Sequence, residues 1–185
     1  LPLLQATNPQ RFSPDAGLAD SGERVLFVGS TRGEFRPIVR DALTADLPLS
    51  LYGVGWQEFV PSECITADFL PNASLPAAYA SAQIVLNDHH AYMAELGFLS
   101  NRLFDTTATA TRVISDQVLG LHEVFGDIVR TYESSSQLQQ LAADPQASFA
   151  SYDRRLDFAR TVAHEHSFAA RAQRLIAHAT QLRDS

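Results

Sequence analysis

The stretch from residue 87 to residue 116, NDHHAYMAELGFLSNRLFDTTATATRVISD, decides the fold that we predict for this chain. It follows the apolar run at residues 84–86, which ends abruptly in Asn-Asp-His-His. Apolar residues then recur at spacings of three and four, as is typical of a helix, and the β-branched run at residues 112–114 comes next. The pattern predicts a strand, a polar loop, a helix and a second strand.

Polar side chains gather where this unit passes from strand to helix. Ligands of an open parallel sheet bind beyond the carboxyl ends of its strands, so these side chains are predicted to line a binding crevice. They are Asn87, Asp88, His89, His90, Asn101, Arg102 and Asp105. The alternative is an ordinary crossover unit with a polar loop and a solvated helix face.

The composition is that of a globular protein and argues against a nucleic-acid-binding surface. The 185 residues suit one domain, 45% of them are hydrophobic, and the formal net charge is -7. All 14 basic residues are arginine, which favours bidentate recognition of phosphate or carboxylate, although a genome rich in G and C gives the same bias. The single cysteine, Cys64, excludes an internal disulfide framework and a cysteine-rich zinc site.

No stretch of the sequence approaches the roughly 20 apolar residues that a membrane span requires. No charged and then apolar leader is recognisable either. We therefore expect a protein without a membrane span and take cytoplasmic residence as the default.

Strands and helices alternate along nearly the whole chain. Apolar runs predict strands at residues 24–28, 49–52, 64–67, 84–86, 112–114 and 128–132, and helical patterns start near residue 37 and cover residues 75–82, 93–104, 118–125, 134–143, 147–162 and 167–182. The alternation predicts an α/β fold with a Rossmann-like, doubly wound parallel sheet of about six strands. We expect a lead-in arm or interdomain connection at residues 1–22, the Rossmann-like domain at 23–145, and two C-terminal helices packed on it at 146–185.

The loop after the first predicted strand, Gly29-Ser30-Thr31-Arg32-Gly33, leads into a helix that starts near Pro37. A strand, a glycine-containing loop and a helix start bring backbone N–H groups and the helix dipole to one point, which is a natural site for a phosphate. Glycine is common in such loops, so glycine alone does not identify a site.

The order of several short motifs resembles one protein family. The motifs are FVGS, Arg36, LYGVGW, LPAAYASAQIVLN, GFLSNRLFDTTATATRVISD, HEVFGD, VRTYESSSQL and HEHSFAARAQRLI. Their succession, over about residues 1–180, resembles the C-terminal domain of a GT-B glycosyltransferase, and most of all the group-1-like branch related to spore maturation proteins. The resemblance implies a domain that binds a nucleotide-sugar donor, UDP- or GDP-linked, without a metal ion or a cofactor. An N-terminal GT-B domain, in the same or a partner chain, would bind the acceptor.

The resemblance also assigns residues to the donor site. Related retaining transferases carry two glutamates eight positions apart, and the second contacts the ribose hydroxyls. Asp105 falls at the second position and Gly97 at the first, so one of the two carboxylates is missing here. Residues implied to contact the substrate are Gly29, Ser30, Asn87, His89, Gly97, Asn101 and Asp105.

The catalytic role implied by the resemblance falls to Arg36 and Arg102, which would stabilise the departing nucleoside diphosphate. The alternative for Arg36 is a surface position on its helix, and for Arg102 a salt bridge to Asp105 one turn on. Trp56 either stacks on a base or packs in the core, and packing is favoured. The pair His89-His90 lacks an apparent third ligand for a metal ion.

Two functions of other kinds stay open, a noncatalytic α/β protein-interaction module and half of a nucleotide-sugar epimerase. A chain of this length has room for one domain, and it begins with Leu1, so we expect part of a longer enzyme that is inactive alone. The last predicted helix carries an apolar stripe at Phe168, Ala172, Leu175, Ile176 and Ala179, part of which we expect to be exposed.

Overall fold

The computed structural model describes residues 3–15, 22 and 24–183, and it contains a sheet of six parallel strands in the order β3-β2-β1-β4-β5-β6. The strands are β1 (Val25–Val28), β2 (Leu49–Tyr52), β3 (Ile65–Ala67), β4 (Ile84–Asn87), β5 (Val113–Ser115) and β6 (Val129–Thr131). This is the doubly wound strand order, so the predicted α/β class and parallel sheet are confirmed.

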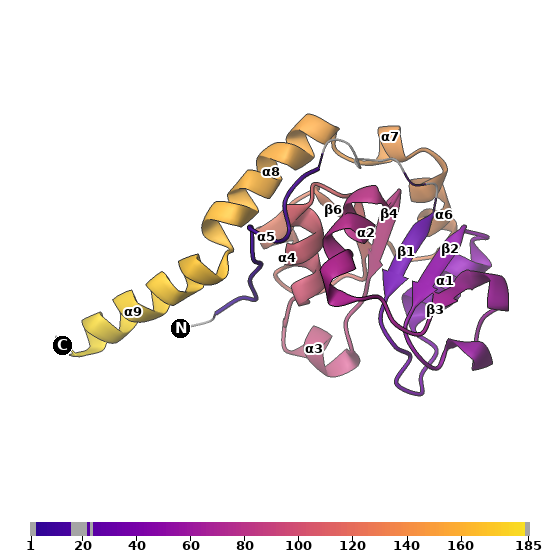
Figure 1. The fold of residues 1–185 in the computed structure, drawn as a ribbon, viewed down its shortest axis with the longest axis horizontal. Helices are drawn as coiled ribbons and strands as arrows, with labels where there is room; N and C mark the ends of the chain where they lie inside the picture. The colour runs from indigo at the N-terminus through magenta and orange to yellow at the C-terminus, as the bar shows by residue number, and fades with distance from the viewer. Residues whose placement is uncertain (1–2, 16–21, 23, 184–185) are drawn as a thin grey trace.

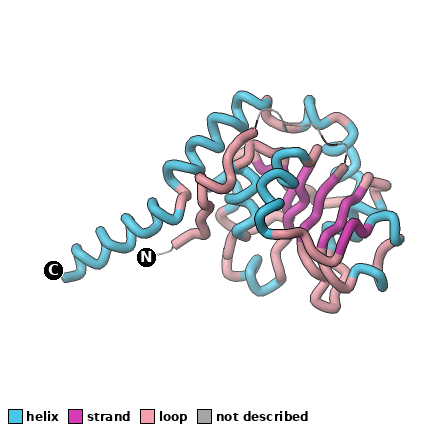
Figure 2. Tube along the Cα trace, viewed as in Figure 1, coloured by secondary structure: helices cyan, strands magenta, loops and turns pink. Residues whose placement is uncertain are grey.

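Helices cover both faces of the sheet, as Figures 1 and 2 show. On one face α1 (Pro37–Thr44) contacts α6 (Ser135–Ala143), and on the other α4 (Asn101–Ala108) contacts α2 (Leu75–Ser81) and α8 (Tyr152–Glu165). The remaining helices are α3 (Ala91–Glu95), α5 (Leu121–Phe125), α7 (Pro145–Ser148), α9 (Phe168–Arg183) and the short 3-10 helices Trp56–Glu58, Ser62–Cys64 and Asn72–Ser74. Among the described residues, no helix combines the length and the apolar character that crossing a membrane would need.

The central strand β1 is apolar throughout because both of its faces are covered. Side chains alternate across a strand. Val25 and Phe27 therefore join the core beneath α1 and α6, while Leu26 joins the core with Tyr79 of α2. This double burial explains the continuous apolar run that predicted a central strand.

The predicted helix at residues 93–104 is two helices, which corrects that prediction. Gly97 has a φ of +63° and lies just beyond α3, where glycine commonly ends a helix. Ser100 then caps α4, and its Oγ accepts a hydrogen bond from the backbone N–H of Arg102. Apolar residues recur at intervals of three and four on both sides of Gly97, so the sequence pattern does not show where the first helix ends. Similarly, the predicted helix at 147–162 is replaced by α7 and by α8, which Ser151 caps.

The described part of the arm, residues 3–15, is docked on the body of the domain rather than free. Thr7 forms a parallel bridge with Ser167, and its backbone N–H donates to the carbonyl of His166 at 2.9 Å. The guanidinium of Arg171 donates to the carbonyls of Leu4 and Gln5. These bonds fasten the arm to the junction of α8 and α9, beside which it runs in Figure 1.

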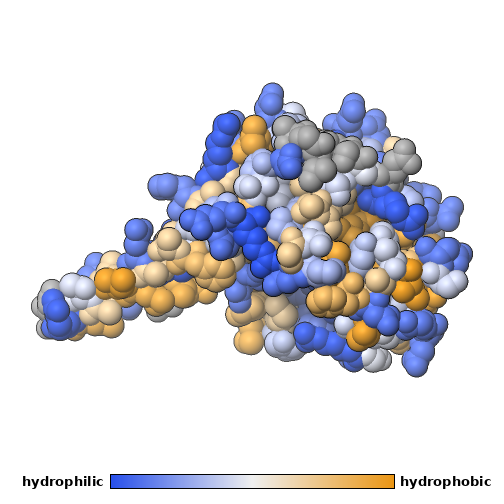
Figure 3. Space-filling view, in the orientation of Figure 1, coloured by the Kyte–Doolittle hydropathy of each residue, from blue (hydrophilic) through white to orange (hydrophobic). Residues whose placement is uncertain are grey.

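The two C-terminal helices differ from each other in packing. α8 packs on α4, as predicted, whereas α9 projects from the body and buries Arg171. Phe168, Leu175 and Ile176 of α9 are 59%, 49% and 67% exposed, and Figure 3 shows apolar side chains along this helix. The start of α9 is held by the arm through Arg171, and its apolar stripe is exposed beyond that point, so the packing expected of residues 146–185 stays a prediction. The prediction that part of the stripe is exposed is confirmed.

Removing the ring of Phe104 tests the core on the α4 face. Phe104 is fully buried, and its ring centroid lies 5.0 Å from that of Phe125 and 5.4 Å from that of His166. We expect Phe104→Ala to lower the free energy of unfolding by about 3–5 kcal/mol, measured by urea denaturation. The control is Phe69→Ala at a 71% exposed side chain, where we expect a change below about 0.5 kcal/mol. Equal losses in the two variants would contradict this packing.

Candidate functional site

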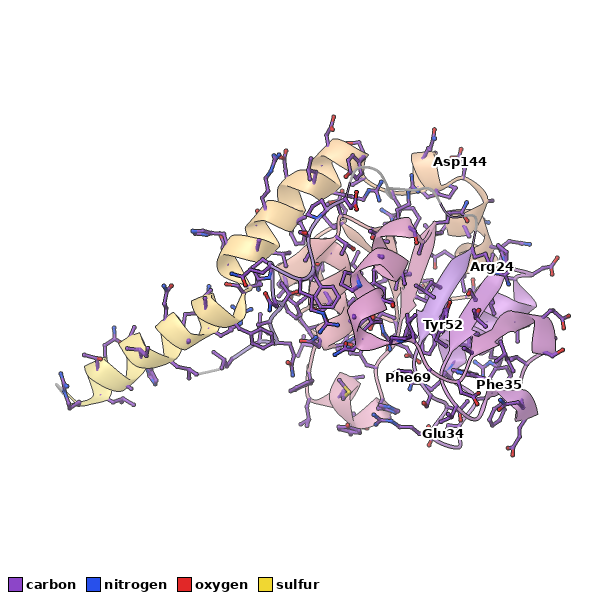
Figure 4. The ribbon with its side chains drawn as sticks, viewed as in Figure 1. Arg24, Glu34, Phe35, Tyr52, Phe69 and Asp144 are labelled. Atoms are coloured by element: carbon purple, nitrogen blue, oxygen red, sulfur yellow. The ribbon has the colours of Figure 1, made fainter. Side chains whose placement is uncertain are left out.

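The crevice predicted from the sequence lies where β1 and β4 pair side by side. The chain leaves β1 for α1 on one face of the sheet and leaves β4 for α4 on the other, so the two connections diverge. Such a divergence at the carboxyl ends of parallel strands leaves room for a ligand. The loops after β1 and β3, which carry Glu34 and Phe69, lie at this edge in Figure 4, and Asp144 lies at the opposite edge.

The loop after β1 is held by the loop after β2. A Cβ atom on Gly53 would lie 2.3 Å from the carbonyl oxygen of Gly29, so only glycine fits at position 53. The same carbonyl accepts a hydrogen bond from Nε1 of Trp56 at 2.9 Å, and Oγ of Ser30 accepts one from the N–H of Val54 at 3.2 Å. Trp56 is fully buried, so the favoured packing role is confirmed. Gly29 and Ser30 are thus fixed at the rim of the sheet.

Arg102 reaches from the first turn of α4 to the end of β1. Its Nη2 donates to the carbonyl of Val28, and its guanidinium lies 4.8 Å from the ring centroid of Phe27. A Cβ atom on Gly29 would approach Nη2 to 3.1 Å, so the positive charge lies directly against this loop. Within the part of the chain that the structure describes, no carboxylate forms an ion pair with Arg102, and the alternative salt bridge to Asp105 is wrong.

Arg36 and Asp88 form a buried bidentate ion pair across the crevice. Nε of Arg36 donates to Oδ2 of Asp88 at 2.8 Å and Nη2 donates to Oδ1 at 2.5 Å, while each residue is 7% exposed. The surface alternative for Arg36 is therefore wrong. Burial raises the pKa of the Asp88 carboxyl, and the charges of Arg36 and Arg102 act in the opposite direction. The positive charge of Arg36 is therefore balanced by the carboxylate of Asp88.

His90 lies next to this pair. Its Nε2 is 3.3 Å from Nη1 of Arg36. Desolvation first, and then the positive charges of Arg36 and Arg32, lower the pKa of His90, which favours the neutral form of its ring. Beside it is a hollow of about 520 Å³ lined by Arg32, Glu34, His90, Ala91, Tyr92 and Glu95, which opens between the loop after β1 and α3.

His89 is enclosed on the other side of β4. Its side chain has no exposed surface, its Nδ1 is 2.6 Å from Oδ1 of Asp116, and its Nε2 accepts the backbone N–H of Ser100 at 2.9 Å. Both ring nitrogens of His89 are therefore engaged within the protein, and the substrate contact expected for this residue stays a prediction. Among the described residues, no group of three His, Cys, Asp or Glu side chains is arranged to hold a metal ion.

Asn87 is the last residue of β4 and is fully buried. Its Nδ2 donates to Oγ of Ser115 at 2.9 Å, which joins the carboxyl ends of β4 and β5. Its Oδ1 is buried and has no hydrogen-bond partner in the protein. Burying an acceptor without a hydrogen-bond donor costs free energy. The Oδ1 atom of Asn87 could therefore accept a hydrogen bond without losing one that it already makes.

Asp105 and Gly97 contact elements away from the loop after β1. The carboxylate of Asp105 accepts hydrogen bonds from Oγ1 of Thr7 and Nδ2 of Asn101, both at 2.7 Å. Burial raises the pKa of Asp105 to about 6, against the opposing effect of these two bonds and of Arg11. A Cβ atom on Gly97 would lie 3.5 Å from the carbonyl oxygen of Leu119. Among the candidate residues, Arg102 thus lies against Gly29 and Asn101 bonds to Asp105, while Gly97 lies beside Leu119.

Sequence reasoning missed several residues that hold the site. Asp116 comes shortly after a predicted strand, in the position that made Asn87 a candidate, so this signal could have found it. Gly53 lies in the Gly-Val-Gly run after the second predicted strand. Thr7, which contacts Asp105 from 98 positions away, had no signal at all.

Comparisons with known proteins agree with this architecture. The sequence model of a family described as glycosyl transferase-like matches residues 32–177. No curated protein sequence matches the chain.

Two solved glycosyltransferase structures have a similar fold. AviGT4, a glycosyltransferase involved in avilamycin A biosynthesis, is 15% identical, with a TM-score of 0.65 over 95% of this chain and 55% of its own. Sucrose-phosphate synthase from Thermosynechococcus elongatus is 17% identical, with a TM-score of 0.67 over 97% of this chain and 52% of its own. The chain thus spans about half the length of these two proteins.

The carboxyl of Asp105 should make stability depend on pH. Its pKa is about 6 in the folded protein against an ordinary value of 3.8, so the folded state binds the proton more tightly. Stability should therefore fall as the pH rises from about 4 to 6 and then level off. We expect Asp105→Asn to lack this fall and to be more stable than the wild type at pH 8, by about 1–3 kcal/mol.

Urea denaturation from pH 4 to pH 8 measures this dependence. The matched control is Asp157→Asn, because Asp157 has a 73% exposed side chain and should keep the pH profile of the wild type. Parallel profiles for the wild type and Asp105→Asn would refute the assignment.

Proposed function

Since the chain belongs to the glycosyl transferase-like family, we propose that it is the donor-binding domain of a GT-B glycosyltransferase. In this proposal the domain binds a UDP- or GDP-sugar and the reaction retains the configuration at the sugar without a metal ion. The order of the sequence motifs supports a place in the group-1-like branch related to spore maturation proteins. A cytoplasmic location belongs to the same proposal.

The observation that carries the proposal is the position of Arg102 at the start of α4. Its guanidinium lies against Gly29 and has no carboxylate partner among the described side chains. The departing nucleoside diphosphate needs positive charge and N–H donors, which a guanidinium and a helix N-terminus supply. We therefore place the diphosphate between Gly29-Ser30 and the first turn of α4.

Arg36 has a different task in this proposal from the one expected at first. Its charge is matched by Asp88, so it contributes less to an anion than Arg102 does. The pair instead holds the start of α1 against the loop after β4, and thereby keeps the two walls of the crevice at a fixed separation. Asn101, at the first position of α4, adds its side-chain amide to the same wall.

The ribose contact stays assigned to Asp105. A carboxylate offers about four acceptor positions, and Thr7 and Asn101 occupy one on each oxygen. A ribose hydroxyl would add a third bond to a carboxylate that is already oriented. Related retaining enzymes have a glutamate at the position of Gly97. Glycine offers no carboxylate, so other groups must contact the sugar here.

The acceptor domain is proposed to face the carboxyl edge of the sheet. Large exposed apolar side chains in the described chain fall into two groups. One lies on loops and helices after β2, β3, β4 and β5, at Val54, Phe69, Tyr92, Leu96, Phe98 and Leu119, and the other on the arm and α9, at Leu3, Phe168, Leu175, Ile176 and Leu182. Apolar surface around a polar crevice is typical of an interface. The structurally similar proteins are about twice as long as this chain, which leaves room for such a domain.

Nucleotide binding tests the donor site. We expect the chain to bind UDP or GDP in calorimetric titration, and Arg102→Gln to weaken that binding by about 1.5–3 kcal/mol, the range for hydrogen bonds to a charged group. Arg160→Gln is the matched control, because Arg160 pairs with Asp157 on the exposed face of α8. No binding of any nucleotide at millimolar concentration would instead favour a noncatalytic interaction module.

Turnover tests the need for a facing domain. Transfer requires the donor and the acceptor to be held together in a crevice that excludes water, and the described residues form one wall of it. We expect this chain alone to bind nucleotide without transferring sugar, as followed by release of nucleoside diphosphate. Robust transfer by the chain alone would contradict the proposal, and conversion of the donor sugar without an acceptor would favour an epimerase.

A further inference from the structure

We propose that His89 and Asp116 form a positioning pair that aims the N-terminus of α4, and with it Arg102, at the diphosphate. This inference rests on the proposed donor site and adds to it two residues that do not touch the substrate. It starts from the acceptor for the backbone N–H of Ser100, the residue that caps α4, because this acceptor is the ring of His89.

The hydrogen bonds determine which nitrogen of His89 carries the proton. A backbone N–H can only donate, so Nε2, which receives the N–H of Ser100 at 2.9 Å, carries no proton. The proton of the neutral ring is therefore on Nδ1, which donates to Oδ1 of Asp116 at 2.6 Å. The second oxygen of Asp116 accepts the backbone N–H of His89 at 3.0 Å, so the carboxylate fixes both the ring and the loop that carries it.

Asp116 is itself held at the end of β5. Oγ of Ser115 donates to its Oδ1 at 3.0 Å, and Nδ2 of Asn87 donates to the same Oγ at 2.9 Å. A continuous series of hydrogen bonds thus runs from the ends of β4 and β5 through the ring of His89 to the start of α4. The ring has no exposed surface, so it can transmit position but cannot reach a ligand.

The position of Ser100 determines where Arg102 lies. Oγ of Ser100 accepts the N–H of Arg102 at 3.3 Å and so fixes the first turn of α4. From that turn the guanidinium reaches the carbonyl of Val28 and the edge of Gly29. A shift of the cap would carry Arg102 away from the loop after β1, and a displacement on the order of 1 Å is enough to weaken a preorganised charge contact.

Two substitutions at position 89 separate the two functions of the ring. His89→Gln places an amide oxygen near the position of Nε2 and keeps an acceptor for Ser100. His89→Asn places its amide near Nδ1, where it can bond to Asp116, and leaves the N–H of Ser100 without an acceptor. Both remove the ring, so a loss that comes from packing alone should appear equally in the two variants.

We expect the backbone amide of Ser100 to be protected from hydrogen exchange in the wild type and in His89→Gln, and to exchange faster in His89→Asn. The dissociation constant for UDP or GDP should stay within about threefold of the wild type in His89→Gln and rise about tenfold in His89→Asn, at similar melting temperatures. Equal losses of affinity in the two variants, or unchanged exchange at Ser100 in His89→Asn, would overturn the positioning role. Absence of nucleotide binding by the wild type would overturn the proposed function instead, and the exchange at Ser100 distinguishes these two failures.

Discussion

The buried ion pair between Arg36 and Asp88 is the constraint on which the crevice depends. It joins the residue that begins α1 to the residue that follows β4, across the point where the two connections diverge. Burying two charges costs several kcal/mol, which only good geometry and full hydrogen bonding repay. Bidentate contact meets that condition here, so the two walls are held at one separation.

Much of the fold could be predicted because it follows from local patterns. A strand buried on both faces, such as β1, must be apolar at every position, and that run is visible in the sequence. The break at Gly97 was missed because apolar residues at intervals of three and four, namely Met93, Leu96, Leu99 and Leu103, fit one helix as well as two. The packing of α9 could not be read from the sequence for a different reason, since periodicity shows that a helix has an apolar face but not what covers it.

The candidate site was likewise predictable where it depends on neighbouring residues in the sequence, and not where it depends on contacts between residues far apart in the sequence. Gly29 and Ser30 follow β1 and Asn87 ends β4, and the rule that ligands bind at the carboxyl edge was enough to make Asn87 a candidate. Their partners could not be predicted, because the contact of Arg36 with Asp88 joins residues 52 positions apart and that of Thr7 with Asp105 joins residues 98 positions apart. One sequence carries no signal for such pairs. The ion pair that Arg36 makes, and that Arg102 does not make with any described side chain, is therefore visible only in the structure.

The helix α4 connects the site to the rest of the molecule through both of its ends. Its first residues are fixed to the ends of β4 and β5 through His89, whereas Asp105, one turn further on, is fixed to the arm through Thr7. The arm is in turn fastened to the start of α9 by Arg171 and by the bridge between Thr7 and Ser167. The eight-residue helix α4 is therefore connected to the crevice, to the arm and, through the arm, to α9. A displacement of α9 or of the arm would act on the helix that carries Arg102.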